Sequence, residues 1–356
     1  MIWLGLAFLS TSWLFALGYY HPVDRTAWAA TVALGVICLL GRPVRPQAPA
    51  TVIVCSLLLC FPSLILLPQP YRTAVALLAA GLLFQLVARR AHVPRWSAVC
   101  TRVSGAALPA GSILLAQAVA IRGYMALTAR SHELVSPLPQ LLGFVARTVG
   151  IDAALHENTI AMHSMRRIHQ LAATWELFLD PVTFCFFVGV LTFFAWFTWQ
   201  GLWNRRQLLG ALGVLAAGML IWLPLRSGAL MAVYLHDVLR TDYAASLDGL
   251  EVFWNSWLHL ALLAGPVAIC WRFLPCGVEA ASAAAADRVD RAATNRQALV
   301  APAMFATAAV LITFGVFWRP VGDRQAGRVL VDEYNAQPDE IWEPTTKPFD
   351  TQWYGT

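Results

Sequence analysis

Acidic residues are scarce in this sequence, above all in its first third. Charged residues make up only 13% of the 356 residues, whereas 58% are hydrophobic. No Asp or Glu stands between Asp24 and Glu133, and none falls inside any of the long apolar runs. Ion-coupled transporters and proton pumps usually contain intramembrane carboxylates, because a charge held in lipid is costly and is kept for a function. The shortage of acids therefore argues against that class of protein.

Several motifs that bind phosphate, metal or redox partners are also missing. There is no glycine-rich phosphate loop, no Cys-x-x-Cys pair and no His-Glu-x-x-His zinc motif. His132, His156, His163 and His169 lack the spacing of metal ligands. We therefore expect neither a metal nor a cofactor. The net charge of +5 comes mostly from arginines in short loops, so it does not indicate a nucleic-acid partner.

Long apolar runs dominate the sequence from one end to the other. Each is close to the roughly 20 residues that a helix needs to cross about 30 Å of hydrocarbon. The sequence therefore predicts an all-α fold, a polytopic membrane bundle of about nine transmembrane helices. The first run has no basic residue before it, so we interpret it as a retained signal anchor. The runs cover residues 2–20, 27–41, 51–68, 72–88, 103–121, 182–203, 208–225, 252–273 and 300–318.

Arginine alternates between the short loops and predicts the orientation of the chain. Basic residues accumulate on the cytoplasmic side of a membrane. The alternation predicts a multi-pass protein of the inner (plasma) membrane, with a cytoplasmic N-terminus and an extracytoplasmic C-terminus. Residues 122–181, 226–251 and 319–356 would then face outward. The arginine-rich loops contain Arg42 and Arg45, then Arg89, Arg90, Arg95 and Arg102, then Arg205 and Arg206, and finally Arg288, Arg291 and Arg296.

The same runs divide the chain into regions. Residues 1–121 form an N-terminal five-helix membrane region, and residues 122–181 form an extracytoplasmic segment. Residues 182–274 contain the helices that we expect to form the functional core. The remaining regions are a cytoplasmic linker over 275–299, a last transmembrane helix over 300–318 and an extracytoplasmic tail over 319–356.

Three polar or reactive residues are predicted to share the outer leaflet. Cys185 is the one cysteine of seven near the outer face, so it has no evident disulfide partner and is a candidate nucleophile. His259 lies inside its run, and Asn255 and Ser256 precede it on the same helical face. Arg226 stands at the outer end of the run over 208–225. A packing cysteine, an interhelical histidine and an interfacial anchor are the structural alternatives for these three residues.

Together, Cys185, Arg226 and His259 have the functional groups needed for nucleophilic catalysis by a thiol. A histidine can take the thiol proton as general base and return it as acid, the thiolate can attack an acyl carbon, and a guanidinium can stabilise the oxyanion. This part of the sequence resembles the exosortases and archaeosortases, membrane enzymes with cysteine transpeptidase-like chemistry. The resemblance covers roughly residues 150–275. It lies in "LPLRSG" around Arg226, in the basic "NRRQ" before it, in "HLALLAG" from His259, and in the spacing of the three residues.

The resemblance implies a cysteine peptidase or transpeptidase that processes C-terminal sorting signals of exported proteins. Its partners would be membrane-tethered proteins with a C-terminal sorting helix, the lipid bilayer and a glycan or lipid acceptor. Cys185, Arg226 and His259 would be catalytic, with Asn255 and Ser256 as a supporting polar face. The tail after residue 319 is similar to the start of the extracytoplasmic extension of some exosortases, which indicates the U subgroup.

The sequence also departs from that family. The family's nucleophile stands in an Ala-Cys-Ser-Gly context, whereas Cys185 stands in "DPVTFCFFVG", and Leu223 replaces the family's Asn before the arginine. If "QLAATWELF" is instead the extended segment that precedes the nucleophile, Leu177 occupies its position. The chain would then be an inactive sorting-signal receptor. A glycan ligase acting on a lipid-linked donor is a further alternative, supported by Arg122, Arg130, Arg147, Arg166 and Arg167 in the outer segment.

Overall fold

The computed structural model describes residues 1–17, 24–40, 49–67, 69–91, 93–130, 134, 136–156, 158–163, 168–199, 205–239 and 256–274. The chain divides into two compact units, Met1–Ala309 and Val310–Thr356, and every described residue belongs to the first. The predicted linker, the last apolar run over 300–318 and the tail lie outside the described residues.

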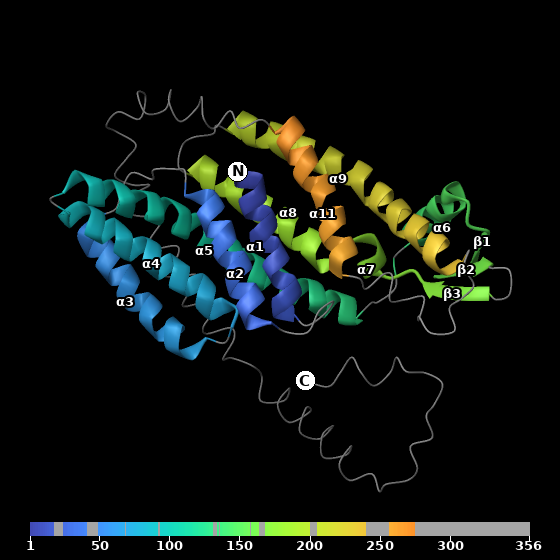
Figure 1. Cartoon of the computed structure of the whole chain (residues 1–356), viewed down its shortest axis with the longest axis horizontal. Coiled ribbons are helices and arrows are strands. Elements are labelled where there is room, and N and C mark those ends of the chain that lie inside the picture. Colours follow the sequence, from blue (N-terminus) through green and yellow to red (C-terminus); the bar gives the residue numbers. More distant parts are fainter. Residues whose placement is uncertain are drawn as a thin grey trace, which may run out of the picture. The chain divides into compact units, whose positions relative to one another are not determined.

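The described part of the chain is mostly helical, as the sequence predicts (Figure 1). A helix coincides with each apolar run between residues 2 and 273, because a backbone in an apolar solvent must satisfy its own hydrogen bonds. These helices are α1 (Ile2–Leu17), α2 (Arg25–Leu39), α3 (Ala50–Leu66), α4 (Tyr71–Arg90), α5 (Pro94–Arg130), α8 (Pro181–Trp199), α9 (Arg205–Tyr234) and α11 (Ser256–Phe273).

Four of these helices are long and apolar enough to cross a membrane. They are α4, the stretch Pro94–Met125 of α5, the stretch Pro181–Thr198 of α8, and α9. The apolar parts of α1, α2, α3 and α11 are shorter, between 10 and 17 residues. The described residues therefore have the character of a membrane protein.

Two helices extend past the boundaries expected from hydropathy. Helix α5 continues to Arg130, beyond the expected end of the N-terminal region at residue 121. Helix α9 continues through Arg226 to Tyr234, and the π-helix η1 (Leu235–Leu239) follows it. The expected outward loop from residue 226 therefore begins as helix, and Arg226 lies inside α9 rather than at its end.

The expectation of an all-α fold is wrong for the segment before α8. After α6 (Leu138–Val149), strands β1 (Ala153–His156), β2 (Thr159–His163) and β3 (Ile168–Ala172) form an antiparallel sheet in the order β1-β2-β3. A short helix, α7 (Trp175–Phe178), follows the sheet. Strands of four or five residues are too short to give a periodicity that outweighs the long helical runs around them.

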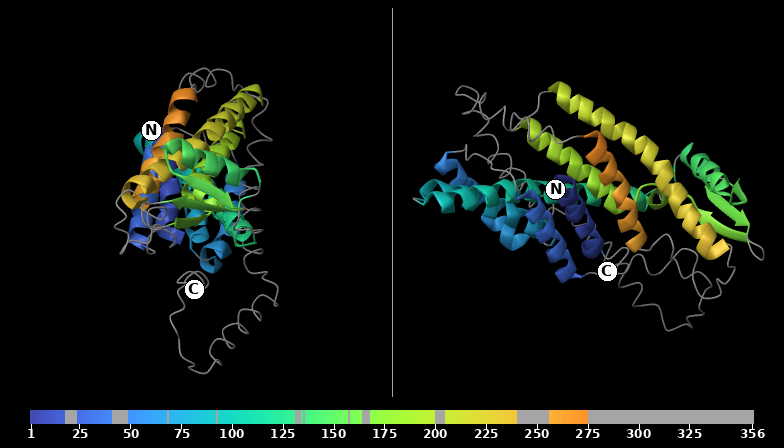
Figure 2. Two further views of the ribbon diagram at one scale, coloured as in Figure 1. Left: turned by 90° about the vertical axis from the view of Figure 1, so that its right-hand side faces the viewer. Right: turned by 45° about the horizontal axis from the view of Figure 1, so that its top comes forward.

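This small sheet and α6 pack against the C-terminal part of α9 (Figure 2). Leu155 of β1 pairs with Ile160 of β2, which in turn pairs with Leu171 of β3. Ile160 is fully buried and belongs to one apolar cluster with Leu177 and Met231. The cluster therefore joins the sheet, α7 and α9 into one packed region next to the start of α8.

Helix α11 contacts α1, α8 and α9, and thereby joins the first and last parts of the described chain (Figure 1).

A buried polar network links α1, α5 and α8. Gln117 donates from Nε2 to the Ser10 hydroxyl and to the carbonyl of Cys185, and it accepts from the indole N–H of Trp13. Because each polar group has a partner, the network can be buried without a large desolvation cost.

Candidate functional site

The site begins where α7 ends and α8 starts, at the sequence Asp180-Pro181. Proline is favoured at the first position of a helix and aspartate at the cap before it. The Oδ2 atom of Asp180 accepts hydrogen bonds from the backbone N–H groups of Val182 (3.1 Å) and Thr183 (3.0 Å). The Asp180 carbonyl accepts the first helical hydrogen bond, from Phe184 N–H (2.9 Å). Asp180 is therefore the N-cap of α8.

Side chains from two other helices bind the carbonyls just before Asp180. Arg226 Nη1 donates to the carbonyls of Leu177 (2.8 Å) and Phe178 (3.3 Å). The hydroxyl of Tyr124, on α5, donates to the carbonyl of Leu179 (2.6 Å). These bonds hold the turn between α7 and α8 against α5 and α9.

Arg226 is completely buried, with 0% of its surface exposed. Its Nε lies 3.0 Å from Asp180 Oδ1, and its Nη2 lies 3.1 Å from Nδ1 of His259. All three guanidinium nitrogens therefore contact protein groups. A snorkelling arginine would extend to the lipid–water interface. The interfacial-anchor alternative for Arg226 is therefore wrong.

The contact between Arg226 and Asp180 is an ion pair buried on both sides, since Asp180 is only 1% exposed. The two atoms are close, but the N–H does not point directly at the oxygen, so the attraction is mainly between the charges. Burial works to raise the pKa of the Asp180 carboxyl. The positive charge of Arg226, with smaller contributions from His259 and from hydrogen bonding to Thr183, outweighs this effect and holds the pKa below its ordinary value. Asp180 is therefore the anion that compensates Arg226.

His259 reaches this site from α11 and is 2% exposed. Two glycines allow α9 and α11 to approach closely enough for its contact with Arg226. A Cβ on Gly265 would overlap the indole ring of Trp222, and a Cβ on Gly218 would lie 2.7 Å from the Ile269 side chain. The pairs 218 with 269, 222 with 265 and 226 with 259 run in opposite directions along the two helices. The antiparallel packing therefore sets the register that brings His259 to Arg226.

Cys185 is also completely buried, on α8. Its carbonyl accepts from Gln117 of α5, but its sulfur makes no hydrogen bond to any described residue. The structure thus brings Arg226 and His259 together, and shows no contact of the thiol with either of them. Leu177, the alternative occupant of the nucleophile position, contacts Arg226 through its carbonyl and is 7% exposed.

The remaining predicted residues add little to the site. Asn255 lies outside the described residues, and Ser256 is the first residue of α11, with a side chain that is not among those described. Of the arginines that favour a glycan ligase, Arg122 is exposed on α5, and Arg147 donates to the carbonyl of Gly143 in its own helix. No group of three metal-binding side chains occurs among the described residues.

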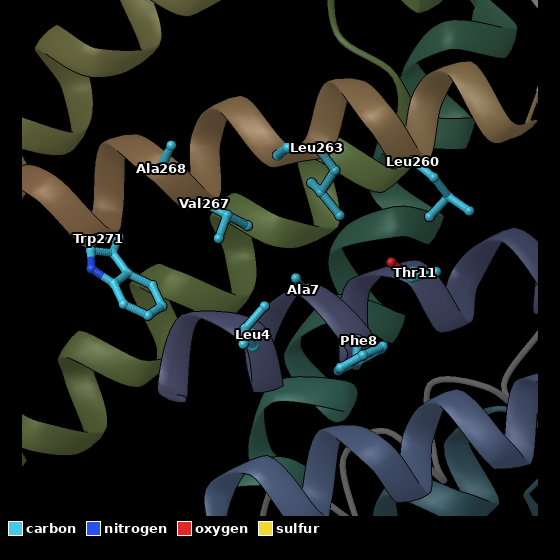
Figure 3. A pocket seen from close by; sticks show the side chains of 10 residues that line it. Leu4, Ala7, Phe8, Thr11, Leu260, Leu263, Val267, Ala268 and Trp271 are labelled. Atoms are coloured by element: carbon cyan, nitrogen blue, oxygen red, sulfur yellow. The ribbon is translucent and has the colours of Figure 1, made fainter.

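An apolar groove lies between α1 and α11 (Figure 3). Its volume is about 480 Å³. Leu4 lies toward Trp271 at one end and Thr11 toward Leu260 at the other, so the two helices run antiparallel. The lining residues are Leu4, Ala7, Phe8, Thr11, Leu260, Leu263, Ala264, Val267, Ala268 and Trp271.

Sequence reasoning did not identify Asp180, although it is the charged partner of Arg226. Asp180 stands two residues before the apolar run over 182–203, so its position outside the run does not mark it as a site residue. The Asp-Pro pair directly before an apolar run is a helix-start signal that could have indicated a buried cap.

No protein-family model, curated protein or solved structure matches the chain. Its function is therefore inferred from the residues and geometry of this site.

Proposed function

We propose that the chain is an exosortase-like membrane protein that binds the C-terminal sorting segments of exported proteins and processes them at the outer face of the membrane. One observation supports this most directly. Arg226 and His259, which the resemblance to the exosortases selects from separate helices, lie 3.1 Å apart in a buried site. Burying two polar residues together costs free energy, and such residues are normally kept in a membrane protein only where they serve a function.

The proposal includes nine transmembrane helices in the inner membrane, with the N-terminus in the cytoplasm. The antiparallel arrangement of α1 with α11, and of α9 with α11, is compatible with that topology. The Arg226 site would then lie toward the outer leaflet. The sheet and α6 would stand at the outer face, beside the site.

The groove between α1 and α11 is a suitable place for the apolar helix of a sorting segment. Leu260, at one end of the groove, is adjacent in sequence to His259. Ala264 and Ala268 follow along α11, and small residues four positions apart allow a second helix to pack closely within a membrane. A helix seated in the groove would place its outer end near His259, where cleavage is needed.

In the peptidase form of the proposal, Cys185 is the nucleophile. The thiol gives up its proton as its sulfur attacks the carbonyl carbon of the scissile peptide. A thioester then forms as the peptide C–N bond breaks and the departing nitrogen takes up a proton. The sorting helix leaves with a protonated amine, and water or an acceptor then attacks the thioester and restores the thiol. This route requires the Cys185 sulfur to reach the substrate beside Arg226 and His259.

A second candidate is a sorting-signal receptor without a nucleophile. It is favoured by the position of Leu177, whose backbone, rather than the Cys185 thiol, contacts Arg226. Such a protein would bind the sorting segment and leave it intact.

Co-expression with an exported reporter that ends in a sorting segment tests both forms. We expect Arg226→Lys to insert and fold but to lose about 10²–10³ in processing rate, because an ammonium cannot replace a planar guanidinium. A receptor would instead co-purify with uncleaved reporter. If wild type neither cleaves nor retains the reporter, but transfers glycan from a lipid-linked donor, the proposal is wrong and the ligase takes its place.

A further inference from the structure

The contact between Arg226 and His259 constrains where His259 carries its proton. A guanidinium has five N–H donors and no acceptor. Because Arg226 Nη2 lies 3.1 Å from His259 Nδ1, that ring nitrogen must present its lone pair. A neutral imidazole whose Nδ1 accepts bears its proton on Nε2. The arrangement is therefore incompatible with a histidine that is protonated at Nδ1.

The position of Arg226 depends in turn on Asp180. The two carboxylate oxygens have separate tasks, since Oδ2 caps α8 and Oδ1 lies beside Arg226 Nε. The cap fixes the carboxylate relative to α8, and the ion pair aims the other edge of the guanidinium at α11. The anion also makes it feasible to bury the cation, because an unpaired buried charge is strongly disfavoured.

We propose that Asp180 is a positioning residue that, through Arg226, holds His259 as a neutral imidazole with its proton on Nε2. His259 then acts as a hydrogen-bond donor to an oxygen that gains negative charge, in place of the general base expected from the sequence. The lone pair that a base would need is already bound to Arg226. A neutral histidine in a donor role is established chemistry in enzymes.

The assignment of the proton rests on contacts within the chain, and only the identity of the substrate oxygen rests on the proposed function. The test can therefore be made without substrate. Full-length protein is labelled with ¹⁵N-histidine in lipid, and the His259 resonances among the eight histidines are assigned by their loss in His259→Gln. The two ring nitrogens have different shifts according to which one bears the proton.

In wild type we expect a protonated Nε2 and an unprotonated Nδ1 at neutral pH. Asp180→Asn retains the helix cap, since asparagine caps as well as aspartate, but removes the charge. We expect it to release Arg226 and give a mixture of the two neutral tautomers. Arg226→Met should do the same. Asp24→Asn is the matched control, because Asp24 caps α2 in the same way, and it should leave the His259 signals unchanged.

A proton on Nδ1 of wild-type His259 overturns the proposal outright. This measurement is made on the wild-type protein, and His259→Gln serves only to assign the resonances. Unchanged His259 signals in folded Asp180→Asn would show that Asp180 does not position the pair. If the tautomer is as expected but no sorting segment is bound or cleaved, the proposed function fails while the assignment of Asp180 and His259 stands.

Discussion

Gly265 on α11 lies against the indole ring of Trp222 on α9, where no larger residue fits without displacing the ring. This contact is one turn before Arg226 along α9, and it lies between His259 and the end of α11. The spacing of "HLALLAG" from His259 to Gly265 thus has a structural reason. The histidine and the glycine contact two positions of α9 that lie one helical turn apart.

Gly265→Val should push α9 and α11 apart and separate Arg226 from His259. Over-packing of a tight helix contact typically costs about 1–3 kcal/mol, and a lower midpoint of thermal unfolding measures it. Gly213→Ala, on α9, is the control, since nothing lies within 4 Å of a Cβ added there. It should be neutral or stabilise the helix by up to about 1 kcal/mol. Equal midpoints for the two variants would contradict the importance of the Gly265 contact.

The ion pair predicts a pattern of double-variant rescue. Arg226→Met leaves the Asp180 carboxylate buried without its counterion, and Asp180→Asn leaves the guanidinium in the same condition. Each should lose about 3–5 kcal/mol of unfolding free energy. The double variant has no uncompensated charge, so it should be more stable than the sum of the two losses implies. Strict additivity of the three free energies would show that the two charges do not interact.

The lowered pKa of Asp180 predicts a dependence of stability on pH. A carboxyl whose pKa is lower in the folded than in the unfolded state stabilises the fold above its unfolded pKa. That stabilisation is lost as the pH falls through the folded pKa, below the ordinary value of 3.8. The stability gap between wild type and Asp180→Asn should therefore be constant from about pH 7 to about pH 5 and narrow below pH 3.8. A gap that already closes near pH 6 would contradict the lowered pKa.

Cys185→Ala separates the peptidase from the receptor. The thiol is small and buried, so its loss should cost only about 1 kcal/mol of stability. In the peptidase, processing of the reporter should stop; in the receptor, retention of uncleaved reporter should be unaffected. Cys270→Ala is the matched control, because Cys270 is equally buried, on α11. Full processing by Cys185→Ala would exclude the thiol as nucleophile.

Filling the groove should weaken binding of the sorting segment. Ala264 and Ala268 are exposed in the groove, so Ala264→Leu and Ala268→Leu can be accommodated without disturbing the core. We expect less crosslinking of a photoreactive sorting helix to α11, with an unchanged unfolding midpoint. Ala261→Leu is the control, since Ala261 is exposed on the same helix but does not line the groove. The same loss in all three variants would show that the groove is not the binding surface.

The sequence by itself determined the helices and two of the site residues. A backbone in an apolar solvent forms a helix to satisfy its own hydrogen bonds, so the existence of α1 through α5, α8, α9 and α11 could be predicted, although α5 and α9 extend well beyond their apolar runs. His259 could be selected because polar groups inside such runs are costly and therefore rare, and Arg226 because it stands at the end of such a run, within "LPLRSG". In the structure Arg226 Nη2 lies 3.1 Å from His259 Nδ1, whereas the thiol of Cys185, the third residue of the predicted set, contacts neither of them.

Only the tertiary structure decided which groups complete the site. Asp180 stands outside the apolar runs, and its role depends on the turn after α7 and on the approach of α9, neither of which leaves a periodic signal. The sheet over Ala153–Ala172 has strands too short to be recognised. The sequence offers both Cys185 and Leu177 as occupants of the position beside Arg226. Which of the two contacts Arg226 depends on how α7 joins α8. That choice is made by packing and by bonds between residues far apart in the chain, such as Arg226 to the Leu177 carbonyl.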